Sequence, residues 1–436
     1  MATGIYLFQN DLRLHDNPAF SLACEEVDHL ICVYCLPPGN ANQYPYRMTQ
    51  LGYARQQFLL QSLDSLREQL HSYGQVLHVL LEHPLDILPQ LISQFSVSAV
   101  YSSEHAGIYE NRIWQTLQGR YPFLVFRQVA GHTLFDRTEL PFDIKELPET
   151  FSAFRRQVDD IPIRNPLSSI TRMPPAIKSI NDYDVVSPML NSRHDNPFTG
   201  GELAGLEHIK HYFASDKPRN YKITRNQLDG WDYSTKFSPW LALGCLSPHT
   251  IIRVLENYEH QHGANDSTGW IKFELLWREY FQWYAHCYGT KMYHFAGIRN
   301  RRPHTAFYPE RFRRWCEGNT PYPIVNACMN QLRQTGFMSN RGRQLVASCL
   351  VNELELDWRY GAGYFEQHLI DYDLASNWGN WQYLAGVGAD PREHRRFNLD
   401  KQTAQYDPEQ RFIRSWQGNK HDGGMDSVDA ADWPIY

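Results

Sequence analysis

The first 130 residues alternate short apolar runs with segments of helical periodicity. The apolar runs are nearly continuous, which is typical of strands buried on both faces of a sheet. Helical patterns at 54–71 and 85–95 lie between them. Strands that alternate with helices predict an α/β domain built on a five-stranded, parallel, doubly wound sheet. The five expected strands are 5–8, 30–36, 76–81, 99–101 and 123–126.

The pattern changes twice further along the chain. Between 131 and 200 the periodicity is lost and prolines recur, so this stretch is interpreted as a long irregular connector. From 201 to about 420 helical periodicity dominates and predicts an all-α domain. The polar residues 421–436 are expected to be a disordered tail. Three parts are therefore predicted: an α/β domain at 1–130, a connector, and a helical domain.

Composition places the chain among ordinary globular proteins and excludes several classes. The N-terminus lacks a signal-peptide pattern, and no apolar run is long enough to cross a bilayer. Eight scattered cysteines favour free thiols in a reducing cytoplasm. Cys32 and Cys35 form a C-x-x-C inside an expected buried strand, so a structural role outweighs a redox or metal role. No metal site is expected.

Two polar segments of the helical half are expected to meet in its interior. The segment 371–383 holds Asp371, Asp373, Asn377 and aromatic residues between apolar neighbours. Buried carboxylates need partners, and the segment 337–344 offers two arginines and an amide. Such a group of side chains suits a large, flat, polar cofactor. A core ion pair beside packing aromatics explains the same residues equally well.

Two further segments carry candidate chemistry. The segment 235–248 combines hydroxyls, a lysine and a proline-started helix, which suits a pyrophosphate, although an ordinary N-cap gives the same pattern. Trp270, Glu274, Trp277 and Arg278 share one face of an expected helix. An acid beside indoles is poorly solvated, so its pKa should be raised and it should donate a hydrogen bond near neutrality. An amphipathic core helix explains the spacing, but it does not explain why an acid lies on the aromatic face.

Charge points weakly to a nucleic-acid partner. The formal net charge of −6 disfavours a general polyanion binder. Six arginines nevertheless fall between 299 and 314, and more follow among aromatic residues. Arginines interleaved with aromatics are typical of a groove that tracks phosphates and stacks bases. Solvated helix faces explain any single one of these arginines.

Taken together, these motifs resemble the photolyase/cryptochrome flavoproteins, and within them the cryptochrome-DASH branch. The similarity covers nearly the whole chain, from 10–17 through 198–202, 235–240, 274–278 and 337–344 to 357–359 and 370–388. It implies an N-terminal α/β domain, a connector and an all-α C-terminal domain that binds FAD. By motif, the expected FAD-binding residues are Tyr221, Thr235, Lys236, Phe237, Ser238, Trp270, Arg278, Asn340, Arg343, Asp371, Asp373 and Asn377, with Arg343 paired to Asp371.

The resemblance also implies a reaction. Reduced flavin excited by blue light would pass an electron to a cyclobutane pyrimidine dimer flipped into the pocket, chiefly in single-stranded DNA. Asn377 would face the flavin, and Glu274 and Trp277 would contact the lesion. Gln344 and Tyr383 mark the DASH branch, and the expected DNA contacts are Trp277, Arg341, Gln344, Tyr383 and Arg395. The alternative is a blue-light photoreceptor, without repair activity, that binds DNA, RNA or a protein. A monomer is expected.

Two features of the resemblance are incomplete. Photoreduction in the family runs along three tryptophans, of which Trp381 and Trp358 match the first two, whereas Thr305 stands at the third position. Slower or rerouted photoreduction is therefore expected, with Tyr308 or another surface aromatic as the substitute. A reduced folate antenna (methenyltetrahydrofolate) is implied near Glu104, although this acid is equally suited to cap a helix.

Overall fold

The N-terminal part is an α/β domain whose sheet is parallel throughout, as predicted. The computed structural model describes residues 1–36, 51–168, 170, 172–177, 197–390 and 395–422. The strand order is β3-β2-β1-β4-β5, so the chain reverses direction across the sheet between β1 and β4. The strands are β1 (Thr3–Phe8), β2 (His29–Cys35), β3 (Leu77–Leu80), β4 (Ala99–Ser103) and β5 (Val125–Val129).

Helices cover both faces of the sheet because its strands are apolar on both sides. One face of β1 and β2, including Ile5 and Val33, packs against α3 and α4. The other face, including Tyr6 and Cys32, packs against α1 and α2 and joins the core of the helical domain. The helices of the α/β domain are α1 (Pro18–Glu26), α2 (Tyr53–Ser72), α3 (Pro84–Gln94) and α4 (Ile108–Arg120).

The last strand differs from the prediction. It begins two residues later than expected, at Val125, and continues to Val129. Phe123, which the apolar run assigned to the strand, is 75% exposed and lies before it. Because β5 is an edge strand in which Val125 and Arg127 are exposed, its apolar positions do not indicate burial as reliably as those of central strands.

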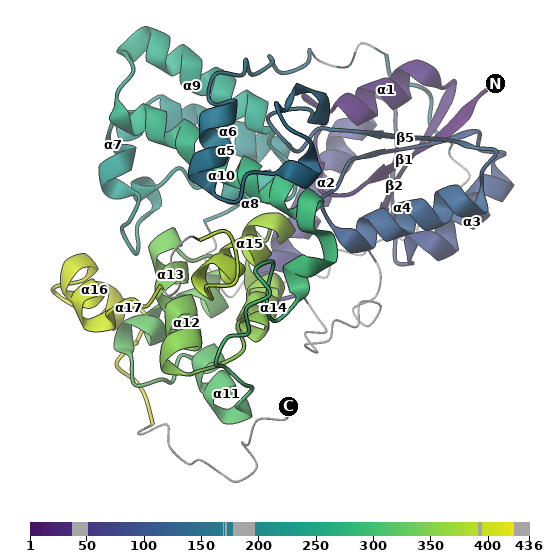
Figure 1. The fold of residues 1–436 in the computed structure, drawn as a ribbon. Coiled ribbons are helices and arrows are strands. Elements are labelled where there is room, and N and C mark those ends of the chain that lie inside the picture. The colour runs from purple at the N-terminus through teal and green to yellow at the C-terminus, as the bar shows by residue number, and fades with distance from the viewer. Residues whose placement is uncertain (37–50, 169, 171, 178–196, 391–394, 423–436) are drawn as a thin grey trace.

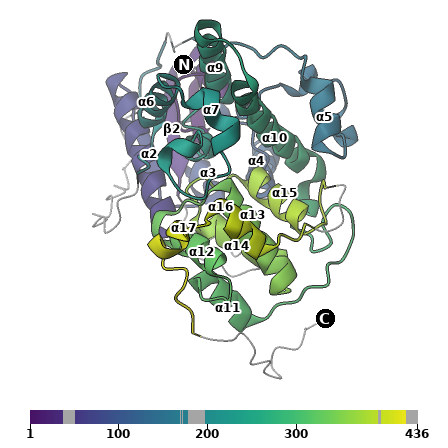
Figure 2. The same cartoon turned by 90° about the vertical axis from the view of Figure 1, so that its left-hand side faces the viewer.

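The connector contains more regular structure than expected. The turns η1 (Arg137–Glu139) and η2 (Ile144–Glu146) precede a helix, α5 (Phe151–Val158). Pro148 precedes α5 and Pro162 follows it, but no proline lies inside α5, so the prolines conceal a helix that they do not interrupt. Figure 2 shows α5 beside the long helix α10 (Asp266–Tyr288) of the helical domain. The connector therefore contributes a packed helix.

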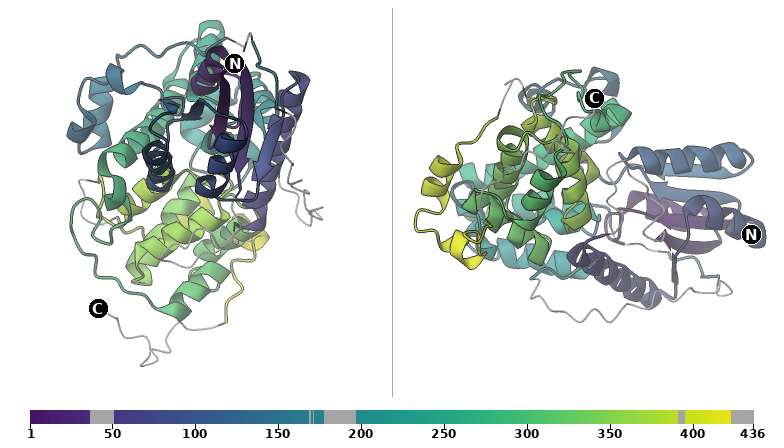
Figure 3. Two further views of the ribbon diagram at one scale, coloured as in Figure 1. Left: turned by 90° about the vertical axis from the view of Figure 1, so that its right-hand side faces the viewer. Right: turned by 90° about the horizontal axis from the view of Figure 1, so that it is seen from below.

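The rest of the described chain is helical, as predicted, and lies beside the α/β domain (Figures 1 and 3). Helix starts coincide with Ser, Asn, Asp and proline at capping positions, for example Ser247 before α9 and Asn265 before α10. The expected tail falls largely at 423–436, outside the described residues. Besides α10, the elements are α6 (Glu202–Phe213), α7 (Lys217–Thr224), η3 (Trp231–Tyr233), α8 (Ser238–Ala242), α9 (Pro248–His262), η4 (Gly289–Tyr293), α11 (Pro309–Glu317), α12 (Pro323–Thr335), α13 (Asn340–Ser348), the π-helix η5 (Cys349–Glu353), α14 (Trp358–His368), α15 (Leu374–Leu384), α16 (Leu399–Tyr406) and α17 (Arg411–Ser415).

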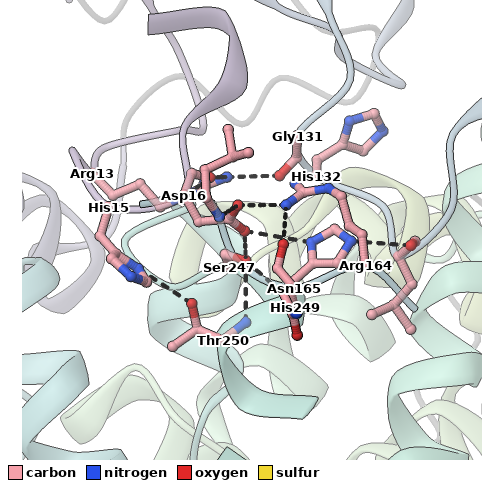
Figure 4. Close-up of polar contacts among 12 residues, drawn as sticks. Arg13, His15, Asp16, Gly131, His132, Arg164, Asn165, Ser247, His249 and Thr250 are labelled. Atoms are coloured by element: carbon pink, nitrogen blue, oxygen red, sulfur yellow. Dashed lines mark hydrogen bonds and ion pairs between the residues drawn. The ribbon is translucent and has the colours of Figure 1, made fainter. Parts of the chain in front are cut away.

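One buried carboxylate joins the α/β domain, the connector and the helical domain (Figure 4). Asp16, in the loop after β1, accepts hydrogen bonds from Arg164 Nη1 at 2.6 Å and from the backbone nitrogen of Leu167 at 2.8 Å. Its other oxygen faces Ser247 and His249 at the start of α9. Burial alone would raise the pKa of Asp16, but the contacts from His249, Arg164 and Ser247 lower it well below its usual range. The three parts thus share a charged anchor.

The loop after β1 contacts the helical domain so closely that one position requires glycine. Gly244 has φ +65°, and a Cβ there would lie 2.0 Å from the backbone oxygen of Asn10. The backbone nitrogen of Leu12 donates to Leu243 O at 3.1 Å, next to this contact. This loop, at the carboxyl end of β1, is where the sheet rule places a ligand, and here it serves as an interface with the helical domain.

Within the described residues, no helix combines the length and hydropathy needed to cross a membrane. All eight cysteines are free thiols. Burial raises the pKa of the Cys32 thiol and raises that of Cys35 to about 12, so the C-x-x-C motif is unreactive packing in β2. No cluster of three potential metal ligands occurs in the part of the chain that the structure describes.

Candidate active site

A cavity of about 470 Å³ lies in the helical domain between α7, α8, α10, α13 and α15. This size is within the range of roughly 300–1,000 Å³ that ligand sites occupy. Most of the predicted site residues line it, although they come from segments far apart in the sequence. These residues are Tyr221, Thr235, Lys236, Phe237, Ser238, Glu274, Trp277, Arg278, Asn340, Arg343, Gln344, Asp371, Asp373, Asn377, Trp381, Tyr383 and Arg395.

The inner wall carries the predicted ion pair. Arg343 Nη2 donates to both carboxylate oxygens of Asp371, at 2.9 and 2.7 Å. The Ser339 side chain caps α13 and sets Arg343 one turn into that helix, where its Nε also binds Met338 O at 2.9 Å. Ser238 Oγ donates to Asp371 Oδ2 at 2.7 Å. The carboxylate is thus fully hydrogen-bonded, which compensates for its burial.

Asp373 and Asn377 hold the start of α15 against its neighbours. Asp373 accepts from the backbone nitrogen of Ser376 at 2.7 Å, as the N-cap of the helix. Gln282 Nε2 from α10 donates to both of its oxygens, at 3.0 and 2.8 Å. Asn377, one turn later, donates its amide to Ala362 O at 3.0 Å. These bonds place both side chains firmly at the cavity wall.

Lys236 supplies a positive charge at the same cavity. Its backbone is left-handed, with φ +55°, and its amino group lies 4.5 Å from the Phe337 ring centroid. Burial lowers the pKa of Lys236 to about 8, although the nearby carboxylates of Asp229 and Asp371 oppose this shift. An anionic ligand beside Lys236 would therefore find a group whose charge is sensitive to mild alkali.

Glu274 has a partner that the sequence reasoning missed. Trp270 Nε1 donates to Glu274 Oε1 at 3.0 Å, and Arg225, at the end of α7, forms an ion pair with the same oxygen. Burial raises the pKa of Glu274, as predicted, although Arg225 and the Trp270 indole act in the opposite direction. The signal for Arg225 was its spacing four residues after Tyr221, which puts both side chains on one face of the chain at α7.

Trp270 itself stands behind the cavity wall. Its ring is contacted by the cations of Lys222 and Arg225, at 5.1 and 5.0 Å. It does not contribute to the lining, whereas Glu274 and Trp277 of the same helix do. Trp270 thus orients Glu274 from the outside, and the expected contact between Trp270 and a cofactor stays a prediction.

The predicted DNA-contacting residues divide between the cavity and its surroundings. Tyr383 lies edge-on to Trp277, with ring centroids 5.9 Å apart. The Arg395 guanidinium lies 4.3 Å above the Tyr383 ring and is paired with Asp390. Gln344 lines the cavity with them. Arg341 is outside it and packs on the Tyr406 ring at 4.8 Å.

The arginines between 299 and 314 do not all form a free cationic surface. On α11, Arg313 and Arg314 bind Glu310, and Arg313 also binds Glu317. Arg311 stacks on Tyr308 at 4.5 Å and lies 3.9 Å from Glu355. Helix-surface ion pairs thus explain these three arginines, which weakens the interpretation of the whole cluster as a phosphate-tracking groove.

Trp381 lines the cavity, and Trp358 lies behind it, at the packed interface of α14 and α15. Gly361, one turn after Trp358 on α14, allows this arrangement, because a Cβ there would lie 2.3 Å from the Trp381 ring. Both indoles are almost fully buried. Thr305 stands near the surface, and its hydroxyl is buried without a hydrogen-bond partner.

Glu104 lies in a second, much smaller hollow between the two domains. This hollow measures about 20 Å³, which is room for one water molecule. Burial raises the pKa of Glu104, and Gln9, His132 and Arg278 line the same hollow. This hollow is too small to hold a folate beside Glu104, and the expected antenna stays a prediction.

The large cavity does suit a flavin dinucleotide. Its polar groups are of the kinds that such a ligand needs: an ammonium and hydroxyls for phosphates, a guanidinium–carboxylate pair and amides for ring edges, and aromatic walls. Lys236, Ser238 and Thr235 would hold the phosphate region. Arg343 with Asp371, and Asn377, would hold the ring system.

Comparisons with known proteins agree with this assignment. The model of the DNA photolyase family matches residues 4–172, and that of the FAD binding domain of DNA photolyase matches residues 270–421. The chain is 51% identical to a cryptochrome DASH of Idiomarina loihiensis, covering 99% of this chain and 96% of that one. It is 52% identical to a cryptochrome DASH of Vibrio parahaemolyticus, covering 99% and 97%. The crystal structure of a Synechocystis cryptochrome superposes with a TM-score of 0.91 at 38% identity, covering 99% and 93%.

Proposed function

We propose that this chain, which belongs to the cryptochrome DASH family, uses FAD and blue light to split cyclobutane pyrimidine dimers, chiefly in single-stranded DNA. One observation carries the proposal. Glu274 and Trp277, adjacent on one face of α10, line the same cavity as the Arg343–Asp371 pair and Asn377. A base-recognising acid and a stacking ring therefore share a chamber with the groups suited to a flavin.

Reduced FAD, when bound and excited, supplies an electron that splits the dimer and returns afterwards, without net oxidation or reduction. The chain's own residues bind and orient. The Arg343–Asp371 pair would offer a fixed charge pattern to the ring system, and Asn377, whose amide nitrogen is held by Ala362 O, would offer its amide oxygen. Trp277, Tyr383 and the other aromatic residues give the chamber apolar walls, so a base and a ring system that fill it would displace water.

Glu274 is suited to read the polar edge of a pyrimidine. Its raised pKa keeps part of the carboxyl population protonated closer to neutrality, and a protonated carboxyl donates to a base carbonyl. Arg225 holds the ionised form in place when no base is bound. Trp277 supplies the stacking surface, worth about 1–3 kcal/mol per base in single-strand binding.

The preference for single strands has a physical argument. Flipping a dimer out of a duplex costs a few kcal/mol, which an unpaired strand avoids. The α11 arginines are already paired with glutamates and add little phosphate attraction for either kind of strand, so the preference rests on the cost of flipping. Arg395, held above Tyr383, lies at the cavity and supports contact with a strand that enters it.

Illumination of the reduced, FAD-loaded protein with defined oligonucleotides tests the proposal. Single-stranded and duplex oligonucleotides that carry one dimer are exposed to blue light, and the remaining dimer is measured by chromatography. We expect light-dependent loss of dimer that is faster in the single strand. Undiminished dimer in both, with the oligonucleotide still bound, would contradict repair and favour the photoreceptor. The Glu274→Gln and Trp277→Ala variants serve as controls for the site.

A further inference from the structure

A phenylalanine from the connector stacks on the ring that lines the candidate lesion site. The rings of Phe151 and Trp277 lie 3.8 Å apart at an interplanar angle of 13°. Phe151 is the first residue of α5, far from Trp277 in sequence, and is 5% exposed. Trp277 lines the cavity, whereas Phe151 does not. One face of the indole is therefore covered from outside the cavity.

The contact is fixed by the residues before and after Phe151. The Tyr280 hydroxyl, on α10, donates to Pro148 O at 3.2 Å and to Glu149 O at 3.0 Å. The Thr150 side chain then caps α5 by accepting from Ala153 N at 3.3 Å. The segment that enters α5 is thus bound to the same helix that carries Trp277.

The stripe on α10 that receives Phe151 surrounds its ring. Phe273, Trp277 and Tyr280 follow at the four- and three-residue spacing of one helix face. Phe273 lies edge-on to Phe151 at 5.1 Å and 86°, and Tyr280 at 6.1 Å and 70°. Edge contacts on two sides and a parallel stack on the third are the preferred geometries of aromatic pairs. They leave the Phe151 ring little freedom to move.

We propose that Phe151 is a positioning residue, which holds the Trp277 ring as a platform for a base that enters the cavity. An indole has two faces, and a fixed ring on one of them leaves stacking to the cavity side, where Phe281 lies beside the indole at 5.6 Å and 30°. Holding that surface in place before a base arrives saves the ordering cost of binding. The inference rests on the proposed function, and it makes the connector part of the site.

Phe154 offers a matched control on the same helix. It is also a fully buried phenylalanine, but it packs on Tyr280 at 5.3 Å and Phe142 at 6.1 Å. Its replacement removes the same side chain from α5 and one contact of Tyr280, but it removes neither ring of the stack. A purely structural role of α5 predicts that Phe151→Ala and Phe154→Ala behave alike. A positioning role predicts that only Phe151→Ala changes the Trp277 ring.

The ring is observed directly by fluorine NMR on the full chain loaded with FAD and labelled with 5-fluorotryptophan. The Trp277 resonance is assigned by its loss in Trp277→Phe. We expect Phe151→Ala to shift and broaden this resonance, Phe151→Tyr to retain it, and Phe154→Ala to leave it unchanged. An unchanged Trp277 resonance in Phe151→Ala would overturn the inference, whether or not the protein binds DNA.

Binding then tests the consequence. Dissociation constants are measured for a single-stranded oligonucleotide with and without one dimer. Phe151→Ala should lose about two- to tenfold of the preference for the dimer, the range of one aromatic pair, while Phe151→Tyr and Phe154→Ala keep it. If the unmodified protein shows no preference, the proposed function fails. If it shows one and Phe151→Ala retains it, only the inference about Phe151 fails.

Discussion

Arg343 places a single nitrogen, Nη2, between both oxygens of Asp371, at 2.9 and 2.7 Å. The Asp371 side chain is only 2% exposed, and that of Arg343 is 24% exposed. Two charges are thus removed largely from water and depend on each other. Ser238 adds a third member by donating to Asp371 from the start of α8. The pair therefore links α8, α13 and the segment before α15 around the cavity.

Replacing Asp371 by asparagine should destabilise the protein even without cofactor. The substitution leaves the Arg343 guanidinium without a counter-charge, which costs about 3 kcal/mol at buried pairs. Chemical denaturation of the cofactor-free protein measures this loss. FAD titration of the same variant should show an affinity at least about tenfold lower, which corresponds to a loss of about 1.4 kcal/mol of binding free energy.

Asp400→Asn is the matched control, since Asp400 is exposed on α16 and outside the cavity. Its free energy of unfolding should change by less than about 0.5 kcal/mol. Adding Arg343→Met to Asp371→Asn should recover part of the loss, because the unpaired charge is then removed. Additive losses in the double variant would show that the two side chains do not depend on each other.

The pKa of Lys236 predicts how FAD affinity varies with pH. Burial lowers this pKa to about 8 in the folded protein. The charged form, which attracts phosphate, is therefore present below pH 8 and is lost as the pH rises through 8. We expect the affinity of the cofactor-free protein for FAD to fall between about pH 7.5 and 9.5, measured by quenching of flavin fluorescence. Because a bound phosphate stabilises the charge, binding should also take up protons at pH 8.5.

Lys236→Met should bind FAD more weakly at pH 7 and show a flatter profile up to pH 9.5. The same substitution should change the free energy of unfolding in the opposite direction, towards greater stability near pH 7. A lysine whose folded pKa is below its unfolded value destabilises the fold most below the folded pKa, and this cost is relieved as the pH rises towards 10.5. A profile for Lys236→Met as steep as that of the unmodified protein would assign the pH dependence to another group.

Glu274 and Arg225 should control the pH dependence of dimer binding. If the protonated carboxyl donates to the base, binding weakens as the pH rises through the pKa of Glu274. Arg225 lowers that pKa, so Arg225→Met should move the transition to higher pH. Glu274→Gln keeps a donor and should abolish the transition. Affinity for a dimer-containing single strand, measured from pH 5 to 9 by fluorescence anisotropy, tests all three expectations. Binding that strengthens with pH in the unmodified protein would contradict them.

The sequence predicted the strands, two helices of the α/β domain, the helical character of 201–420 and the ion pair for identifiable reasons. Continuous apolar runs define central strands, and a buried Asp371 requires a cation, of which the segment 337–344 holds two. Where burial is partial, a continuous apolar run does not define the strand: β5 begins after Phe123, and that residue is exposed. The helix α5 was missed because prolines before and after it dominate the composition of the connector.

Contacts between distant segments were harder to predict. Gln282 binding Asp373, Arg225 binding Glu274 and Phe151 stacking on Trp277 all depend on how helices pack, and no local pattern encodes it. A buried acid in the sequence indicates that a partner is needed, but any of several polar groups can be that partner.

Thr305 occupies the position where a third tryptophan was expected, and the structure suggests where an electron enters instead. The Trp358 ring lies 5.7 Å from Trp378, which lies 4.7 Å from Tyr293. Tyr293 lies 6.5 Å from Tyr109, which is 41% exposed. An uninterrupted series of oxidisable rings thus leads from Trp358 to the surface of α4.

The chemistry of these rings favours Tyr109 as the terminal donor. Oxidised tyrosine must lose its proton. The buried Tyr293 hydroxyl has no hydrogen-bond partner among the described residues, and burial raises the pKa of Tyr293. Tyr109 is exposed and releases its proton to water. The alternative from the sequence, Tyr308, carries the Arg311 guanidinium 4.5 Å from its ring centroid, and a cation there opposes the positive charge of oxidation.

Tyr109→Phe should therefore shorten the lifetime of the charge separation that blue light produces in the protein loaded with oxidised FAD. In this route one electron would pass from Tyr109 through Tyr293, Trp378, Trp358 and Trp381 to the photoexcited flavin, which would be reduced by one electron, and the Tyr109 proton would pass to solvent. Transient absorption and electron paramagnetic resonance should show a neutral tyrosyl radical in the unmodified protein and in Tyr308→Phe. Tyr109→Phe should leave a tryptophanyl radical that recombines about tenfold faster or more, since its charge is no longer neutralised by proton release. A tyrosyl radical that persists in Tyr109→Phe and disappears in Tyr308→Phe would place the exit at Tyr308, on the side of Thr305.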